Sequence, residues 1–296
     1  MKKKIITRRD FLRVAAMTPL AGALASGLKA REKPSLDKAR VVLVRDKNAL
    51  ISFNNPHPEV IRKMLDEAVT TLLGEKDPVD AWRKLIKPSD IVGIKSNVWH
   101  YIPTGRVIEQ AIKKRVMDAG VPDTRIDISD RRVRRSRVFK AATALINARP
   151  ARTHHWSGLG TCLKNYVTFV SDIPYYHPDS CADLAKIWYL PQVKGKTRLN
   201  ILIMLHPLFH GIGPHHFSRN YTWEYNGILV GKDPVAVDAT GLRIMQAKRR
   251  EFFGRERPLQ VPAKHIFLAD TRHGLGVSDP DRIELIKLGY KEGIFI

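Results

Sequence analysis

The 296-residue sequence predicts an α/β protein with a mostly parallel open sheet and helices on both faces. Short apolar runs rich in β-branched residues alternate with longer segments of helical periodicity, and short joins link them, as in βαβ units. The hydrophobic content of 44% is ordinary for a globular chain. The middle section, from about 130 to 216, is rich in His, Gly and Pro, so we expect it to be irregular.

The first half of the chain alternates most clearly. We expect strands at residues 41–44, 91–95 and 125–128, and helices at 58–73, 79–86 and 107–119. The helix at 58–73 carries apolar residues at helical spacing, and Gly74 follows it as a stop signal. Gly120 and then Pro122 end the helix at 107–119 in the same way.

The second half continues with strands that we expect at 199–205, 227–230, 266–268 and 283–286. Asp233 is a natural N-cap, and Pro234 suits the first turn of a helix that continues through Met245. No internal repeat, low-complexity segment or long linker interrupts the chain. Residues 31–296 are therefore predicted to form a single α/β domain.

The first 30 residues have the pattern of a twin-arginine signal peptide. Three lysines precede "TRRDFL" at 7–12, which closely resembles the consensus of the twin-arginine (Tat) route. Residues 14–25 are apolar but too short for a membrane span, which needs ~20 residues. Small residues favour cleavage after Ala25, with Ala30 as a second candidate. The alternative is a helical N-terminal arm on a basic protein.

Export through this route would make the protein periplasmic or otherwise exported, with the Tat translocase as a partner and no transmembrane span in the mature chain. The leader contains seven Lys or Arg and one Asp, so it accounts for +6 of the formal net charge of +22 and leaves +16. Such a basic protein attracts small anionic ligands or acidic surfaces, whereas export disfavours nucleic acid. Tat cargo crosses the membrane folded, often around a cofactor, so a bound metal or organic cofactor is worth testing.

The two cysteines and the histidines restrict which cofactors the chain could bind. Cys162 and Cys181 are too few for a four-cysteine iron–sulfur cluster, and they could form one disulfide or remain two buried thiols. Seven of the 11 histidines lie between 154 and 216, and imidazole binds several transition metals. The candidate metal ligands are His154, His155, His206 and His210. Their spacing matches no ligand template, and Pro207 and Gly211 favour a loop around the last two.

Two further segments could bind anions. "GLGTCLKN" at 158–165 fails the phosphate-loop patterns, but as a flexible turn it could present Lys164 and backbone N–H groups to an anion. "DRRVRRSRVFK" at 130–140 holds five arginines and one lysine. Most such runs are solvated faces, and the alternative is an anion-binding rim.

Five segments, in order along the chain, match one family pattern. They are "DIVGIKSN" (90–97), "ARTHHWSGLGTCLKN" (151–165), "GIGP" (211–214), "ILVGKDPVAVDATG" (228–241) and "GLGV" (274–277). Together they resemble the domain of unknown function 362 family. Arg152 stands where that family usually has Lys, and the ferredoxin-like cysteine segment of many members is missing. The activity of the family is not established, so the resemblance implies fold and architecture more than function.

The shared polar residues lie at strand ends or turns, where open α/β sheets bind ligands. The catalytic candidates are Lys95, His154, Lys164 and Asp238, and the ligand-binding candidates are Asn97, Asn165, Gly213 and Asp233. The two lysines could clamp an anion, the two asparagines could orient it, and His154 could act as general acid or base. The simpler interpretation is that Gly213 shapes a turn and Asp233 caps a helix. If Asp238 is buried, we expect a cationic partner for it.

Two functions remain open from the sequence. In the first, an exported α/β protein binds or acts on a small anionic molecule at the strand ends, with or without metal or cofactor assistance. In the alternative, a periplasmic binding or accessory protein docks an anionic partner through its basic surface.

Overall fold

The computed structural model describes residues 38–211, 213 and 216–296, which belong to one compact unit. The predicted signal peptide lies outside the described residues, as do Pro214 and His215. Within the described part of the chain, no helix is both long enough and apolar enough to cross a membrane.

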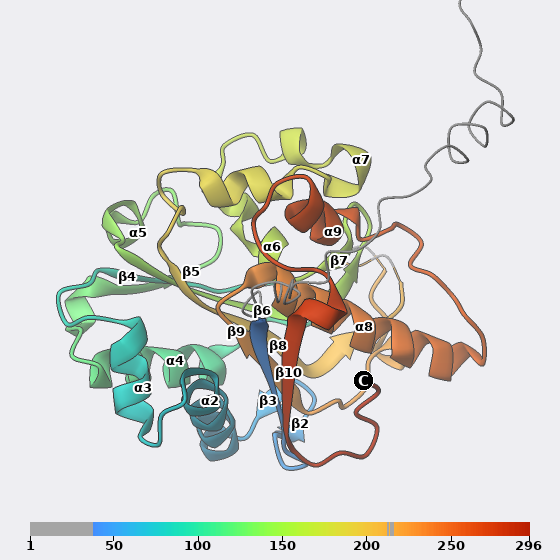
Figure 1. Ribbon diagram of the computed structural model, residues 1–296, viewed down its shortest axis with the longest axis horizontal. Helices are drawn as coiled ribbons and strands as arrows, with labels where there is room; N and C mark the ends of the chain where they lie inside the picture. The colour runs from blue at the N-terminus through green and yellow to red at the C-terminus, as the bar shows by residue number, and fades with distance from the viewer. Residues whose placement is uncertain (1–37, 212, 214–215) are drawn as a thin grey trace, which may run out of the picture. The chain divides into compact units, whose positions relative to one another are not determined.

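An eight-stranded sheet forms the centre of the described chain (Figure 1). Its strands are β1 (Ala39–Arg45), β4 (Val92–Lys95), β5 (Ile126–Ser129), β6 (Ala144–His154), β7 (Gly158–Gly160), β8 (Thr197–Leu208), β9 (Gly227–Gly231) and β10 (Ile283–Gly289). The order is β10-β1-β9-β8-β6-β4-β5, and β7 pairs with β6. The β1–β10, β4–β5, β4–β6 and β6–β8 pairs are parallel, whereas β9 and β7 pair antiparallel. The prediction of a mostly parallel sheet is confirmed.

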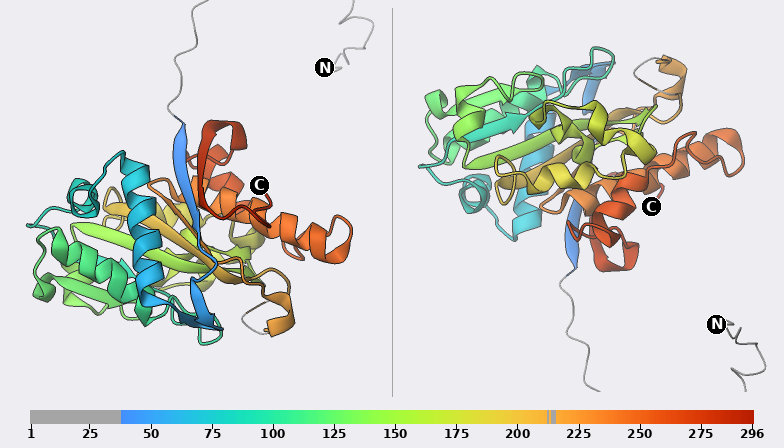
Figure 2. Two further views of the ribbon diagram at one scale, coloured as in Figure 1. Left: turned by 90° about the horizontal axis from the view of Figure 1, so that it is seen from below. Right: turned by 90° about the horizontal axis from the view of Figure 1, so that it is seen from above.

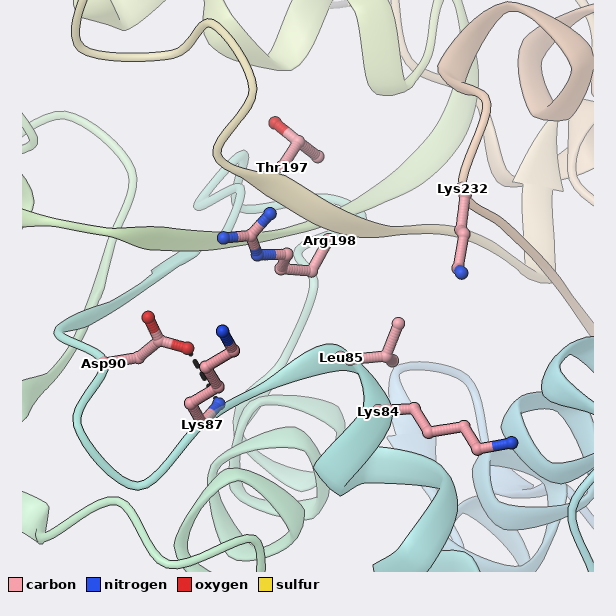
Figure 3. Close-up of a pocket in the computed structure, with 7 residues that line it drawn as sticks. All are labelled: Lys84, Leu85, Lys87, Asp90, Thr197, Arg198 and Lys232. Atoms are coloured by element: carbon pink, nitrogen blue, oxygen red, sulfur yellow. Dashed lines mark hydrogen bonds between the residues drawn. The ribbon is translucent and has the colours of Figure 1, made fainter.

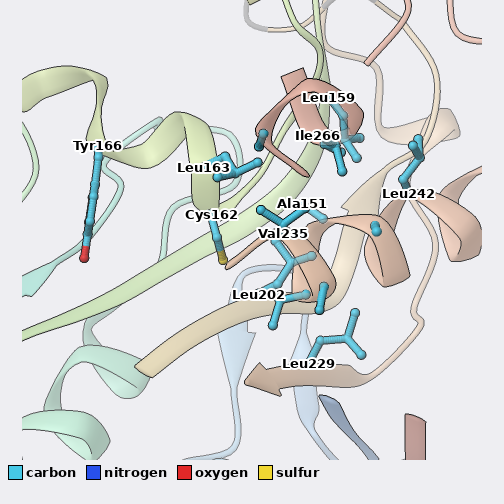
Figure 4. Close-up of a cluster of buried hydrophobic side chains, with 14 of the residues drawn as sticks. Ala151, Leu159, Cys162, Leu163, Tyr166, Leu202, Leu229, Val235, Leu242 and Ile266 are labelled. Atoms are coloured by element: carbon cyan, nitrogen blue, oxygen red, sulfur yellow. The ribbon is translucent and has the colours of Figure 1, made fainter. Parts of the chain in front are cut away.

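Helices cover both faces of this sheet (Figure 2). On one face lie α2 (Pro58–Leu73), α3 (Pro78–Leu85) and α4 (Arg106–Asp118). On the other lie α5 (Arg137–Ala141), α6 (Cys162–Asn165), α7 (Pro178–Cys181), α8 (Pro234–Phe253) and α9 (Lys264–Thr271). Figure 4 shows how Cys162 and Leu163 of α6 pack with Val235 of α8 over the strands. Each face therefore has its own hydrophobic core.

Shorter elements complete the described chain. A small hairpin joins β2 (Leu50–Ser52) and β3 (Asn55–Pro56). The 3-10 helices are η1 (Asp123–Arg125), η2 (Tyr166–Phe169), η3 (Pro174–Tyr176), η4 (Leu184–Tyr189), η5 (Arg219–Tyr221) and η6 (Pro280–Arg282). Three of them, η2, η3 and η4, lie between α6 and β8, in the section that was expected to be irregular.

The predicted helix boundaries agree with local chemistry. Helix α2 ends at Gly74, whose left-handed φ of 68° suits glycine. Helix α8 begins after Asp233, whose side chain accepts hydrogen bonds from the backbone N–H groups of Val235 (2.8 Å) and Ala236 (3.1 Å).

Two local predictions are wrong. Residues 266–268 were expected to form a strand but lie in α9, where His265, Ile266 and Ala269 are buried. Three apolar residues are too few to separate a strand from a helix by periodicity. His206 was expected in a loop but lies in β8, which continues through Pro207 to Leu208.

Strand β6 was not predicted, although it lies inside the sheet between β8 and β4 and all 11 of its residues are buried. Ala144, Ile146 and Ala148 face the α2 side, whereas Leu145 and Ala151 face the α8 side. By the same alternation Arg149 faces the α8 side. The pairing of β6 with β8 shifts register between Pro150 and Arg152, and such irregularities redirect side chains.

Candidate functional site

Five buried charged residues gather where the parallel strands β4, β5 and β6 end. Lys95 is the last residue of β4, Asp130 follows β5, and Arg149 and Arg152 lie in the second half of β6. Lys164 comes from α6, which follows β7. All five are buried. The carboxyl ends of parallel strands are the usual position of a ligand site in an open α/β sheet.

Lys95 has a complete set of protein acceptors. Its ammonium group donates to Asp130 Oδ1 (2.5 Å), to the Ser96 carbonyl (2.6 Å) and to Asn165 Oδ1 (3.3 Å). Burial lowers the pKa of Lys95 to about 8, although the Asp130 carboxylate opposes this. Burial would raise the pKa of Asp130, but the Lys95 ammonium outweighs it and holds that pKa below its usual range. Lys95, which was predicted to bind an anionic ligand together with Lys164, instead forms an ion pair with Asp130.

Asn165 belongs to a row of buried amides that crosses the sheet. Its Nδ2 donates to Asn147 Oδ1 (2.8 Å), and Asn147 Nδ2 donates to Asn200 Oδ1 (3.0 Å). Asn200 Nδ2 in turn donates to the Lys232 carbonyl (3.0 Å). Asn147 and Asn200 are aligned partners on β6 and β8, so sheet register assembles the row. Neither residue was a candidate from the sequence, because neither belongs to a motif and only the register of β6 and β8 brings them together.

Asp238 is fully buried in α8, and its partners are backbone groups. Its two oxygens accept from the N–H groups of Cys162 (2.9 Å) and Leu163 (2.8 Å). Burial raises the pKa of Asp238 to about 6, while the nearby Thr161 side chain, these two backbone hydrogen bonds and the charge of Arg149 oppose the shift. The expected cationic partner makes no ion pair with Asp238 in the described chain. The charge of Arg149 acts on this carboxylate only from a distance, and the turn at 158–165 supplies backbone donors. The anion that this turn binds in the structure is the carboxylate of Asp238.

Lys164 is buried, and its ammonium group has one polar partner in the described chain, a thiol. Its Nζ lies 3.5 Å from Cys181 Sγ. Burial lowers the pKa of Lys164 to about 8, and the charge of Arg149 acts in the same direction. Cys162 and Cys181 are both free and buried, so they are not joined in a disulfide.

Arg149 is the least satisfied charged group of the site. Its residue surface is 3% exposed, yet no described residue accepts a hydrogen bond from its guanidinium, and its Nε is buried without a partner. Burial lowers the pKa of Arg149, while the charges of Asp130 and Asp238 oppose this from a distance. Both carboxylates already have other donors. A Cβ on Gly160 would lie 2.9 Å from Arg149 Nη2, so glycine there leaves room for the guanidinium.

Arg152 is held by Asn97 and Trp99. Its Nη1 donates to Asn97 Oδ1 (2.9 Å), and its guanidinium carbon lies 4.5 Å from the centre of the Trp99 ring. Its Nε is buried without a partner in the described chain. Burial lowers the pKa of Arg152 well below its usual value, and Arg149 adds to this. Asn97 therefore orients an arginine. Gly213 packs beside Trp99 and accepts a hydrogen bond from the His155 N–H (3.3 Å).

His154 has one ring nitrogen in use. Its Nδ1 lies 3.2 Å from the Trp156 N–H, which donates to it, so we assign the ring proton to Nε2. Burial first, and then the charges of Lys164, Arg149 and Arg152, lower the pKa of His154 far below its usual value. The imidazole is thus neutral and offers Nε2–H as a hydrogen-bond donor. This state suits anion binding better than the acid–base role expected from the sequence.

The four candidate metal ligands lie in different surroundings. His154 and His155 stack with ring centres 4.7 Å apart. His206 Nε2 contacts Asn54 Oδ1 at 2.5 Å, and His210 Nδ1 lies 3.1 Å from Arg249 Nη1. Within the described ranges, no group of three or more His, Cys, Asp or Glu could hold a metal ion.

The contacts of Asp233 are with backbone groups that hold the fold together. Besides capping α8, its carboxylate accepts from the Val277 N–H through Oδ2 (2.8 Å). Asp233 therefore joins α8 to the glycine turn at 274–277, one of the segments in the family resemblance. These contacts agree with the simpler interpretation that Asp233 caps a helix.

A second basic feature lies at the opposite ends of the parallel strands. It is a hollow of about 330 Å³ lined by Lys84, Leu85, Lys87, Asp90, Thr197, Arg198 and Lys232 (Figure 3). Its three lysines are exposed, and Lys84 pairs with Glu75. Arg198 donates to the Gly195 and Thr143 carbonyls. Its lysines are open to solvent and Arg198 has protein acceptors, so this hollow lacks the unpaired buried cation of the other end.

The fold and the site define an α/β protein with a buried, predominantly cationic cluster at the carboxyl ends of parallel strands. Residues 107–243 match the model of the family described as "Domain of unknown function (DUF362)". This match covers less than half of the chain, includes Arg149, Lys164 and Asp238, and supports the resemblance to that family. Neither the curated proteins nor the solved structures include a match.

Proposed function

We propose that this protein binds a small anion through Arg149, Arg152, Lys164 and His154, which we call the basic cluster. The carrying observation is that the buried guanidinium of Arg149 has no acceptor among the described residues. Leaving a charge buried and unpaired costs several kcal/mol. A bound anion would supply the missing acceptor and offset that cost.

The remaining donors of the cluster support the same proposal. Lys164 Nζ carries three N–H groups, and its only described contact is with the Cys181 thiol. His154 offers Nε2–H, and Arg152 uses only Nη1, toward Asn97. Anion binding therefore needs no rearrangement of the existing hydrogen bonds.

Other buried polar groups would position the cluster without touching the ligand. Asp238 holds the backbone of Cys162 and Leu163 in α6, the helix that carries Lys164. Asn165 connects the same helix to Lys95 and to Asn147. These contacts would fix Lys164 against β6, so that its ammonium group and Arg149 face a common ligand.

A paired substitution tests the proposal. Titration calorimetry with phosphate, sulfate and acetate should give binding to the wild-type chain that is lost in Arg149→Met. Arg249→Met is the matched control, because Arg249 is also buried but donates to the carbonyls of Phe209, Arg257 and Pro258. This control should bind anions as the wild type does, although it is less stable. Equal binding by wild type and Arg149→Met would overturn the proposal.

We also propose that the chain is exported by the Tat route, on the strength of the "TRRDFL" motif and its flanks. Replacing Arg8 and Arg9 with Lys in a tagged chain should retain it in the cytoplasm in cell fractionation. Export of the doubly substituted chain at the normal level would contradict this.

A second candidate function is docking of an acidic partner through the exposed arginine run at 131–137. Arg131, Arg132, Arg134, Arg135 and Arg137 are exposed, and no described carboxylate pairs with them. Binding to vesicles rich in anionic lipid, lost when these arginines become Gln but kept in Arg149→Met, would support docking. Equal vesicle binding by the neutralised chain would exclude it.

A further inference from the structure

We infer that the ligand of the basic cluster is a doubly charged, tetrahedral oxyanion: inorganic phosphate, or the phosphoryl group of a phosphate monoester. This rests on the proposed function and specifies its ligand class. Two independent features support it, namely the balance of buried charge and the arrangement of unused donors.

The charge balance favours a dianion. The buried cations at this end of the sheet are Lys95, Arg149, Arg152 and Lys164, and the buried carboxylates in the described chain beside them are Asp130 and Asp238. With all six groups ionised, two positive charges lack a counter-charge. A monocarboxylate would leave one of them uncompensated in a medium of low dielectric constant, whereas a dianion neutralises both.

Sheet geometry brings these charges into one region, because Gly160 of β7 lies against Arg149 Nη2 and is aligned with Arg152 of β6. The electrostatics agree with this. Burial lowers the pKa values of Lys95, Arg152 and Lys164, and the charge of Arg149 lowers each of them further. His154 responds to Lys164, Arg149 and Arg152 alike. A single ligand charge at this point would therefore interact favourably with every member of the basic cluster.

The donors favour a tetrahedral group. One guanidinium fork is enough to bind both oxygens of a carboxylate in a plane. Here the whole fork of Arg149 is unused, and Lys164, His154 and the Nε of Arg152 offer further N–H groups from α6 and the end of β6. A carboxylate has only two oxygens to share among all these donors, whereas a phosphoryl group presents more acceptor oxygens in several directions. Arginine also suits phosphate geometry.

Titration calorimetry at constant ionic strength separates the possibilities. Phosphate and sulfate should bind the wild-type chain at least about tenfold more tightly than acetate, a difference of about 1.4 kcal/mol. Succinate serves as a planar-carboxylate dianion and should bind more weakly than sulfate. The tryptophan fluorescence, to which Trp99 beside Arg152 contributes, gives a second readout.

Two variants locate the binding. Arg149→Met should abolish phosphate binding, whereas Lys232→Met, in the exposed hollow, should leave it unchanged. Loss of binding only in Lys232→Met would place the anion at that hollow and overturn both proposals. Equal affinity for acetate and sulfate would overturn the assignment of a dianion. Equal affinity for succinate and sulfate would overturn the assignment of a tetrahedral group. In both cases the proposal of anion binding would still stand. Failure of every anion to bind would contradict the proposed function.

Discussion

Arg149 and Arg249 place the same side chain in two different buried environments. Arg249 is 2% exposed and donates to three backbone carbonyls, so its charge is matched by protein dipoles. Arg149 is 3% exposed and has only distant carboxylates. A buried charge without a close partner lowers stability unless a ligand compensates it. This difference indicates that Arg249 has a structural role, whereas Arg149 is available to bind a ligand.

The two arginines should therefore respond oppositely to substitution. In ligand-free buffer, Arg149→Met should raise the free energy of unfolding by about 1 kcal/mol or more, because it removes an unpaired buried charge. Arg249→Met should lower it by about 3 kcal/mol, because it leaves buried carbonyls unpaired. Urea unfolding at neutral pH measures both values. Strong destabilisation by Arg149→Met would mean that Arg149 has a structural partner and is not a free anion-binding group.

The two buried lysines predict a pH dependence. Burial lowers the pKa values of Lys95 and Lys164 from 10.5 to about 8. Between about 8 and 10.5 the unfolded chain then binds more protons than the folded one, so the free energy of unfolding rises with pH. Anion affinity should fall over the lower part of the same window, as Lys164 loses its charge. Urea unfolding and calorimetry at several pH values test this. Lys164→Met should flatten both trends, and an unchanged profile in this variant would contradict the assignment.

At the element scale, α6 and α8 are joined through one carboxylate. Asp238 of α8 accepts from two successive N–H groups of α6, the short helix that carries Lys164. Helix α6 has four residues, and packing and this contact hold it in place. The geometry of the basic cluster should consequently depend on Asp238.

Asp238→Asn should weaken anion binding as well as stability. An amide has a single acceptor oxygen, and its NH₂ group would face a backbone N–H, so we expect a loss of about 3 kcal/mol in unfolding free energy. The comparison is Asp233→Asn, because Asn is also a good N-cap and Asp233 lies in another contact set. Amide exchange at Cys162 and Leu163 should accelerate in Asp238→Asn alone. Unchanged exchange there would show that the carboxylate does not hold α6.

Local sequence patterns were sufficient to predict most helices and strands, but they were insufficient to predict the residues of the basic cluster. The helix at 58–73 was predicted with the bounds of α2, since its apolar spacing and Gly74 are local signals. Strand β6 was missed because Asn147, Arg149 and Pro150 interrupt its apolar run, and only the fold brings their partners together. Lys164, His154 and Asp238 were chosen by their residue type and family resemblance. No sequence pattern marked Arg149 as a candidate, because its lack of a hydrogen-bond acceptor becomes visible only in the folded structure.

At the scale of the whole molecule, positive charge occurs in two forms. Most of the formal net charge of +22 comes from residues such as those at 131–137, which water solvates. Exposed charges of this kind steer anions over long distances and are screened by salt. The residues of the basic cluster are buried, so a bound anion should be much less sensitive to ionic strength than vesicle docking is. Weak salt dependence of phosphate affinity, measured by calorimetry, would agree with this.

Anomalous scattering from crystals soaked in tungstate, a tetrahedral dianion, tests the central claim most directly. The account predicts a tungsten peak among Arg149, Lys164 and His154, with its oxygens within hydrogen-bond distance of the Arg149 guanidinium. The peak should be absent from crystals of Arg149→Met. An empty basic cluster in soaked wild-type crystals, with Arg149 hydrogen-bonded to protein carbonyls instead, would contradict the account.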